Sequence, residues 1–137
     1  MTGRLGLVLA GVALGATPAA AAGPSIAGNW VTADRTAVVR VAECGRKLCG
    51  TVVEVLARGV PRSDVHNPRR ALRARPLVGL QVLRGFAARG GEWRGGTAYD
   101  PKTGNSYRAT LALAPDGRLK VTGCVLLICR SQMWTRD

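Results

Sequence analysis

The chain has 137 residues, with 20 lysines and arginines against 8 aspartates and glutamates, so its formal net charge is +12. A hydrophobic content of 47% with 20% charged residues is typical of one globular domain and excludes an intrinsically disordered chain. Because His66 is the one histidine, the composition also excludes metal sites built from several histidines.

Residues 1–22 have the pattern of a cleaved secretory signal peptide. Arg4 supplies a positive charge, residues 5–16 form an apolar run, and alanines at 19–22 offer a cleavage site before Gly23. The run is shorter than the roughly 20 residues that cross a bilayer, which disfavours the alternative of an uncleaved membrane anchor. We therefore expect a periplasmic or secreted bacterial protein, not an integral membrane protein, with one domain at residues 23–137.

Alternation of apolar and polar residues predicts about eight short antiparallel strands in the rest of the chain. The clearest example places Ala37, Val39 and Val41 on one face and Arg40 on the other. The predicted strands cover residues 28–32, 36–43, 48–56, 80–86, 93–99, 108–113, 118–122 and 131–136. So many short strands in a chain of this length predict an all-β fold, either a closed barrel or a compact sandwich.

The cysteines form two pairs with the same spacing, Cys44 with Cys49 and Cys124 with Cys129. Four cysteines allow three connectivities, and the spacing does not choose between them. Two local bridges are the simplest arrangement, crossed bridges between the pairs are the second, and a four-thiolate zinc site is the rival. Because disulfides persist in exported proteins and the apolar residues 125–128 suit zinc poorly, we expect disulfides and no metal site.

Residues 57–75, here called the Arg-rich loop, follow no strand or helix period. They contain six arginines and a single acidic residue, Asp64. A helical turn is expected at residues 69–73, with Asp64 and Asn67 as candidate capping residues. A connection of this length indicates either a functional loop or a lid over one end of the sheet.

The motifs that resemble catalytic sites are weak. His66 lies beside Asp64, but the nucleophile, base and orienting group of a hydrolase are rarely neighbours in sequence. Residues 100–104 lack the acidic ligands of a calcium loop and are expected to form a hairpin turn. We therefore expect no enzymatic activity and no cofactor, and a hydrolase that uses His66 is the alternative.

Two tryptophan motifs mark the ends of the strand series. Gly28-Asn29-Trp30 opens the first strand, and Trp134-Thr135-Arg136 closes the last. Together they resemble the lipocalin pattern, in which an arginine of the final strand covers the tryptophan at the base of the barrel. The resemblance implies that Trp30 and Arg136 form this barrel-closing pair.

Motifs along the whole chain are similar to those of an exported bacterial family, domain-of-unknown-function family 2147. They are G-x-W at 28–30, the C-G and L-C-G motifs at 44–50, D-x-x-N-P at 64–68, R-P-L-x-G at 75–79, W-x-G-G at 93–96, the Y-D-P, G and Y positions at 99–107, L-K-V-x-G at 119–123 and Q-x-W-T-R at 132–136. The resemblance implies a small, antiparallel, up-and-down β-barrel that is lipocalin-like, with one long Arg-rich loop or short helix. It implies an exported location and no particular activity.

Two binding functions remain open for such a barrel. In the first, the barrel holds a small apolar or amphipathic ligand at its open end. The candidate ligand-binding residues are Asp64, Asn67, Arg75, Tyr99 and Tyr107, for which loop capping and hairpin packing are the alternative roles. In the second, the Arg-rich loop binds anionic lipid, lipopolysaccharide or an acidic partner protein. Nucleic acid is not expected as a partner, because export separates the protein from it.

Overall fold

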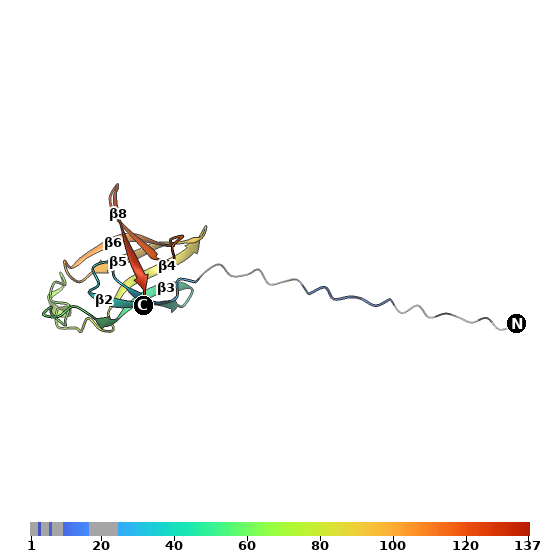
Figure 1. Ribbon diagram of the computed structural model, residues 1–137, viewed down its shortest axis with the longest axis horizontal. Helices are drawn as coiled ribbons and strands as arrows, with labels where there is room; N and C mark the ends of the chain where they lie inside the picture. The colour runs from blue at the N-terminus through green and yellow to red at the C-terminus, as the bar shows by residue number, and fades with distance from the viewer. Residues whose placement is uncertain (1–2, 4–5, 7–9, 17–24) are drawn as a thin grey trace.

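The computed structural model describes residues 3, 6, 10–16 and 25–137, and its strands form a closed antiparallel barrel (Figure 1). Each strand pairs with the next one along the chain, and the last pairs with the first. The strands are β1 (Gly28–Val31), β2 (Ala37–Cys44), β3 (Lys47–Val55), β4 (Gln81–Arg89), β5 (Glu92–Asp100), β6 (Asn105–Leu113), β7 (Leu119–Val125) and β8 (Ile128–Arg136). The prediction of an up-and-down β-barrel is confirmed, and the sandwich alternative is wrong.

The predicted signal peptide, residues 1–22, lies largely outside the described residues. Of this segment, residues 3, 6 and 10–16 are described, and they form neither helix nor strand. Within the described part of the chain, no helix is long and apolar enough to cross a membrane.

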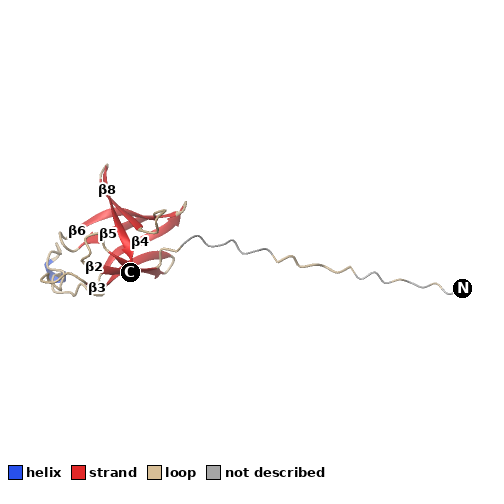
Figure 2. Cartoon of the chain, in the orientation of Figure 1, coloured by secondary structure: helices blue, strands red, loops and turns tan. Residues whose placement is uncertain are grey.

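Every predicted strand overlaps one of the observed strands, which are red in Figure 2. β6 begins at Asn105, three residues before its predicted start, and the other main differences lie in the β4–β5 and β7–β8 hairpins. β4 continues to Arg89, and β8 already begins at Ile128. In both hairpins a tight turn lets the strand ladder continue to the tip, with positive φ at Gly90 and Gly91 in one and at Leu126 in the other. The sequence pattern misses these strand ends because they are exposed on both faces and lose the apolar alternation.

The hydrophobic core fills one half of the barrel, at the end where the β2–β3, β4–β5 and β6–β7 turns lie. Its largest side chains, Trp30, Phe86, Leu111 and Leu119, are fully buried. The indole N–H of Trp30 donates a 2.8 Å hydrogen bond to the backbone carbonyl of Ile26. Burial of side chains of this size contributes about 2 kcal/mol each. We call this part of the barrel the closed half.

Arg136 covers Trp30 at the base of the closed half. Its guanidinium carbon lies 4.1 Å from the centre of the indole ring, which is a cation–π contact. The same guanidinium donates hydrogen bonds to the carbonyls of Ala27 and Ser25, at 2.8 and 3.1 Å. Gly28 has a φ of +126°, and a Cβ there would lie 2.9 Å from Nη1 of Arg136, so this close approach requires glycine. The arrangement fastens the two ends of the strand series to each other.

The opposite end of the barrel, here called the open half, carries the β1–β2 turn, the Arg-rich loop, the β5–β6 turn and the β7–β8 hairpin. The loop contains one turn of 3₁₀-helix, η1 (Arg70–Leu72), where a helical turn was predicted. The predicted capping roles are wrong: the residue before η1 is Arg69, and it makes no side-chain capping bond. Asn67 instead accepts a 2.8 Å bond from the backbone N–H of Arg69, and Asp64 is used elsewhere.

The barrel is joined weakly along one seam. β1 and β8 share two residue pairs, Trp30 with Arg136 and Val31 with Thr135. Beyond these pairs, residues 128–134 of β8 pair with β7, and the described chain places no strand on their other side. In Figure 1, β8 accordingly rises away from the barrel toward its hairpin. The wall of the open half therefore has a gap between β8 and the β1–β2 turn.

Both disulfides are local. Cys44 is bonded to Cys49 across the β2–β3 turn, and Cys124 is bonded to Cys129 across the β7–β8 hairpin. Crossed bridges and a zinc site made of four thiolates are therefore wrong, because all four sulfurs are oxidised in local pairs. Two structural disulfides are consistent with an exported protein.

Candidate functional site

The open half of the barrel contains a cavity of about 450 Å³. Its walls are mainly aliphatic and come from several strands. The lining residues include Val39, Val52, Val82, Val121 and Trp134. Cavities of about 300 to 1,000 Å³ with mostly apolar walls are typical of small-molecule sites. The interior is therefore not filled by side chains, and the cavity is the candidate functional site.

The cavity exists because small residues occupy inward positions in the open half. Ala98 of β5 lies opposite Tyr107 of β6, and Gly123 of β7 lies opposite Arg130 of β8, and all four line the cavity. In the closed half, Phe86 of β4 and Leu119 of β7 fill the interior. In the open half, Ala98 and Gly123 leave space that their neighbours do not fill, and this space is the cavity.

Polar side chains gather where the cavity meets solvent. Arg130 and Gln132 lie on the inner face of β8 together with Trp134, yet both are exposed because the seam beside β8 is open. Within the described chain, Arg130 makes no hydrogen bond or ion pair. Its guanidinium is therefore free to bind an anionic or polar group at the cavity mouth.

An ion pair crosses the mouth. Lys102 of the β5–β6 turn donates a hydrogen bond to the carboxylate of Asp34 in the β1–β2 turn, and both residues line the cavity. These two turns lie on opposite sides of the barrel, since their strands are four positions apart in the order of eight. Burial alone would raise the pKa of Asp34, but hydrogen bonds from Lys102, Thr36 and Thr32 hold that pKa well below its usual range. The bond to Asp34 in turn raises the pKa of Lys102. Both groups therefore remain charged at neutral pH.

Asp64 is a fully buried carboxylate that fastens the Arg-rich loop to the barrel. It accepts a 2.6 Å hydrogen bond from the hydroxyl of Tyr99 on β5 and a 2.8 Å bond from the amide of Asn67. Arg75 donates a 3.0 Å hydrogen bond to it from Nε, and Nη2 of Arg75 forms an ion pair with the same carboxylate at 2.9 Å. Burial alone would raise the pKa of Asp64, but these donors lower it below its usual value. Burial and the bond to Asp64 raise the pKa of Tyr99 to about 12.

The five residues predicted to bind ligand lie in two different places. Tyr99 and Tyr107 line the cavity, whereas Asp64, Asn67 and Arg75 form the cluster under the Arg-rich loop and do not line it. The cluster satisfies Asp64 with protein donors, so its evident role is to position the loop. The ring of Tyr99 connects the two places, because it borders the cavity while its hydroxyl contacts the cluster.

A second depression, of about 390 Å³, lies between the Arg-rich loop and the outer side of β4 to β6. The loop contributes Arg69 and Arg75 to it, and β4 contributes Arg84. Thr97 and Ser106 add hydroxyl groups to its polar surface. Arg75 is paired with Asp64, but Arg69 and Arg84 make no side-chain hydrogen bond or ion pair to the described residues, so the depression is suited to an anionic group.

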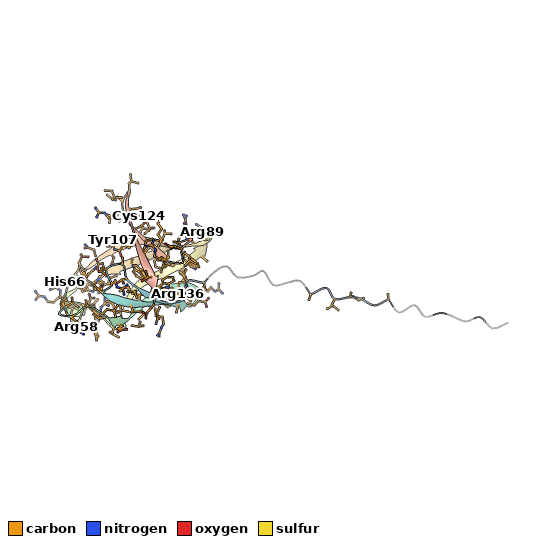
Figure 3. All side chains as sticks on the ribbon, in the orientation of Figure 1. Arg58, His66, Arg89, Tyr107, Cys124 and Arg136 are labelled. Carbon is orange, nitrogen blue, oxygen red and sulfur yellow. A yellow bond between two sulfur atoms is a disulfide. The ribbon has the colours of Figure 1, made fainter. Side chains whose placement is uncertain are left out.

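Two further arginines of the Arg-rich loop donate hydrogen bonds to backbone carbonyls. Arg62 donates a 3.2 Å bond to the carbonyl of Val55, and Arg73 donates a 2.7 Å bond to that of Asn67. Together with Arg75, half of the arginines in the loop thus bind their own chain. His66 is exposed, and Figure 3 shows it with Arg58 at the end of the molecule far from Arg89, in the Arg-rich loop and not in the cavity.

Sequence reasoning missed Arg130, Gln132 and the β7–β8 hairpin as parts of the site. Arg130 and Gln132 share the face of the buried Trp134 through their spacing of two, but both are polar, so no apolar alternation marks this face as inward. The predicted strand at residues 131–136 also leaves Arg130 outside the sheet.

The sequence model of a bacterial family described as "Uncharacterized protein conserved in bacteria (DUF2147)" matches residues 28–136, which is the whole barrel. Among solved structures, protein HP1028 from the human pathogen Helicobacter pylori, described as belonging to the lipocalin family, is similar with a TM-score of 0.73. The two chains are 21% identical, and the match covers 82% of this chain and 83% of that one. No curated protein sequence matches the chain. At this identity the structural likeness establishes the lipocalin-like fold.

Proposed function

The chain belongs to the DUF2147 family, and on that premise we propose that its lipocalin-like barrel binds a small apolar or amphipathic ligand in the open half. The observation that carries the proposal is the cavity of about 450 Å³ with mainly aliphatic walls. Removing apolar ligand surface from water is favourable by about 25 cal/mol per Å², so such walls favour an apolar chain or ring.

The placement of polar groups supports an amphipathic ligand in particular. Val52 and Val121 line the apolar part of the cavity, whereas Arg130 and Gln132 lie at the open seam. A ligand with its apolar part inside would present its polar end to Arg130. An anionic or hydrogen-bonding head group fits this position best.

We propose binding without catalysis. Among the described residues that line the cavity there is no histidine, serine or cysteine. The carboxylate of Asp34 is held by Lys102, and that of Asp100 accepts hydrogen bonds from Lys102 and Thr103 of its own turn. His66, the residue on which a hydrolase would depend, lies in the Arg-rich loop outside the cavity. We also propose that the protein works in the periplasm or outside the cell, which its two disulfides favour.

The test is binding of a fluorescent fatty-acid analogue, followed by native mass spectrometry of the protein as purified from its expressing cells. We expect the analogue to bind the full chain and the substitution Ala98→Phe, which fills the cavity, to weaken binding at least about tenfold. The matched control is Ala87→Phe, an exposed position of β4 that does not line the cavity. Equal binding by both variants, or failure of the unsubstituted protein to bind any apolar probe, would contradict the proposal.

The second depression favours one further candidate function. We propose, as the alternative, that Arg69 and Arg84 bind an anionic component of the cell envelope such as lipopolysaccharide. The substitutions Arg69→Gln and Arg84→Gln should weaken lipopolysaccharide binding at low salt. Arg58→Gln with Arg70→Gln removes the same charge from outside the depression and should have a smaller effect. Equal losses in the two double variants would point to net charge and not to this site.

A further inference from the structure

The β7–β8 hairpin ends in four consecutive aliphatic side chains that are exposed to solvent. Val125 is 54% exposed, Leu126 is 95%, Leu127 is 99% and Ile128 is 71% exposed. A contiguous apolar patch of this kind on a protein surface commonly marks a site of interaction with a membrane or another protein. We call these four residues the apolar tip.

The apolar tip is held in a fixed position. Val125 and Ile128 are the last paired residues of the β-ladder, and the disulfide between Cys124 and Cys129 closes the hairpin directly behind them. The tip projects from the body of the molecule, and Cys124 lies at its base in Figure 3. The exposed side chains are therefore presented on a short, cross-linked hairpin and not on a free loop.

The residues of the tip are not those that the turn itself favours. Leu126 has a φ of +53°, a region in which glycine or asparagine is usual and a bulky residue is an outlier. Leu126 thus costs backbone energy at the turn, and both leucines expose apolar surface to water. Such a conflict between local preference and observed residue is expected where the side chains serve a function.

Charge identifies the surface that the tip fits. Arg130 follows the disulfide directly, and Arg108 of β6 lies opposite Cys124, so two exposed guanidinium groups lie just behind the tip. From residue 117 to residue 136 the chain contains no acidic residue. Asp34, an acidic residue at the mouth, is paired with Lys102. An apolar tip backed by cations matches a bilayer surface with anionic headgroups, where the acyl region lies below the charge.

The tip is also continuous with the cavity, since Val125 and Ile128 line both. From these observations we propose that the apolar tip inserts into the surface of an anionic lipid bilayer and turns the open seam beside β8 toward the lipid. Insertion of the tip does not depend on a ligand in the barrel. Passage of a ligand from the bilayer through the open seam into the cavity rests on the binding function proposed above.

The test is flotation of the full, disulfide-bonded chain with vesicles of neutral phosphatidylcholine, alone or mixed with anionic phosphatidylglycerol. We expect binding to the mixed vesicles and a loss of at least about tenfold in the double variant Leu126→Ser with Leu127→Ser. The matched control, Val60→Ser with Val78→Ser, removes two exposed aliphatic side chains from the connection between β3 and β4 and should bind like the unsubstituted protein. Arg130→Gln should reduce the preference for anionic vesicles.

A separate readout reports insertion directly. In the variant Leu127→Trp, indole emission should shift to shorter wavelength on mixed vesicles, and a quencher placed in the acyl chains should reduce it. The proposal is overturned if the tip variant floats like the control, or if the emission of Leu127→Trp does not change. It is also overturned if the tip mediates dimers and no vesicle binding, which would identify a second copy as the occupant.

The outcomes for the tip and for the cavity are distinguishable. The double tip variant should still bind the fatty-acid analogue in the absence of vesicles, because the cavity walls remain. The variant Ala98→Phe should still float with mixed vesicles, because the tip remains. Folding of each variant is checked by near-UV circular dichroism before binding is compared.

Discussion

The hydroxyl of Tyr99 donates a 2.6 Å hydrogen bond to the fully buried carboxylate of Asp64, and this contact joins β5 to the Arg-rich loop beside the cavity. The two residues are 35 positions apart in sequence. A buried carboxylate is tolerated when its oxygens are satisfied, and here Asn67 and Arg75 supply the remaining donors.

Removal of the Tyr99 hydroxyl should destabilise the protein. Tyr99→Phe leaves one oxygen of Asp64 without its donor, at an expected cost of about 1–3 kcal/mol in the free energy of unfolding. Tyr107→Phe is the matched control, because Tyr107 also lines the cavity but its hydroxyl makes no hydrogen bond to the described residues. Urea denaturation of both variants provides the measurement. A similar loss in the two variants would show that the bond to Asp64 contributes little.

The same pair predicts a loss of stability at alkaline pH. Burial and the bond to Asp64 raise the pKa of Tyr99 from 10.0 in the unfolded chain to about 12 in the folded protein. The folded state therefore binds the proton more tightly, so the stabilisation is complete below pH 10 and is lost as the pH rises toward 12. The loss should be on the order of 2 kcal/mol. It should be absent from Tyr99→Phe, and the difference between the two pH profiles isolates it from other titrating groups.

The barrel could be predicted because its signals are local. Alternation with period two marks each strand, and the G-x-W and W-T-R motifs mark the two strands that close the barrel. Asp64, Asn67, Arg75 and Tyr99 are predicted to share one end of the barrel, but the sequence does not predict that the other three donate hydrogen bonds to Asp64. Its motif with Asn67 was visible, but the hydroxyl that completes the site comes from Tyr99 on a strand whose register the sequence does not specify.

The apolar tip was missed for a different reason. A short apolar run between two cysteines has the same pattern whether it is buried in a sheet or exposed at a turn. Exposure of Leu126 and Leu127 follows from the position of the hairpin at the open end, which depends on how all eight strands pair. Similarly, the small inward residues Ala98 and Gly123 reveal a cavity only when the opposite strands are known.

A close approach between the Arg-rich loop and the β5–β6 turn requires glycine at position 104. Gly104 has a φ of +76°, and a Cβ there would lie 2.0 Å from the backbone oxygen of His66. Gly104→Ala should therefore displace the loop and cost more than the ~1 kcal/mol of positive φ alone. Gly45→Ala provides the control, since Gly45 has a φ of +67° and nothing within 4 Å of such a Cβ. The melting temperature should fall further for Gly104→Ala than for Gly45→Ala. Equal decreases in melting temperature would mean that the Arg-rich loop shifts to accommodate the Cβ at little cost.

The ion pair between Asp34 and Lys102 is predicted to restrain the cavity mouth and to contribute little to stability. Both side chains are more than a third exposed, so solvent screening limits their contribution to at most about 1 kcal/mol. Lys102→Gln should leave the unfolding free energy nearly unchanged but increase hydrogen–deuterium exchange several-fold in the β1–β2 turn, because the contact across the mouth is lost.

The matched control for the mouth is Arg118→Gln, which removes an exposed ion pair with Asp116 from the β6–β7 turn of the closed half. It should change stability as little as Lys102→Gln does and should not alter exchange in the β1–β2 turn. Higher salt should accelerate that exchange in the unsubstituted protein and have a smaller effect in Lys102→Gln, since the screened contact is already absent. If exchange in the turn is the same in both variants, the two sides of the mouth are held by their own hairpins. The carboxylate of Asp34 would then be fixed by Thr32 and Thr36 alone, with which it makes hydrogen bonds of 2.9 and 2.7 Å.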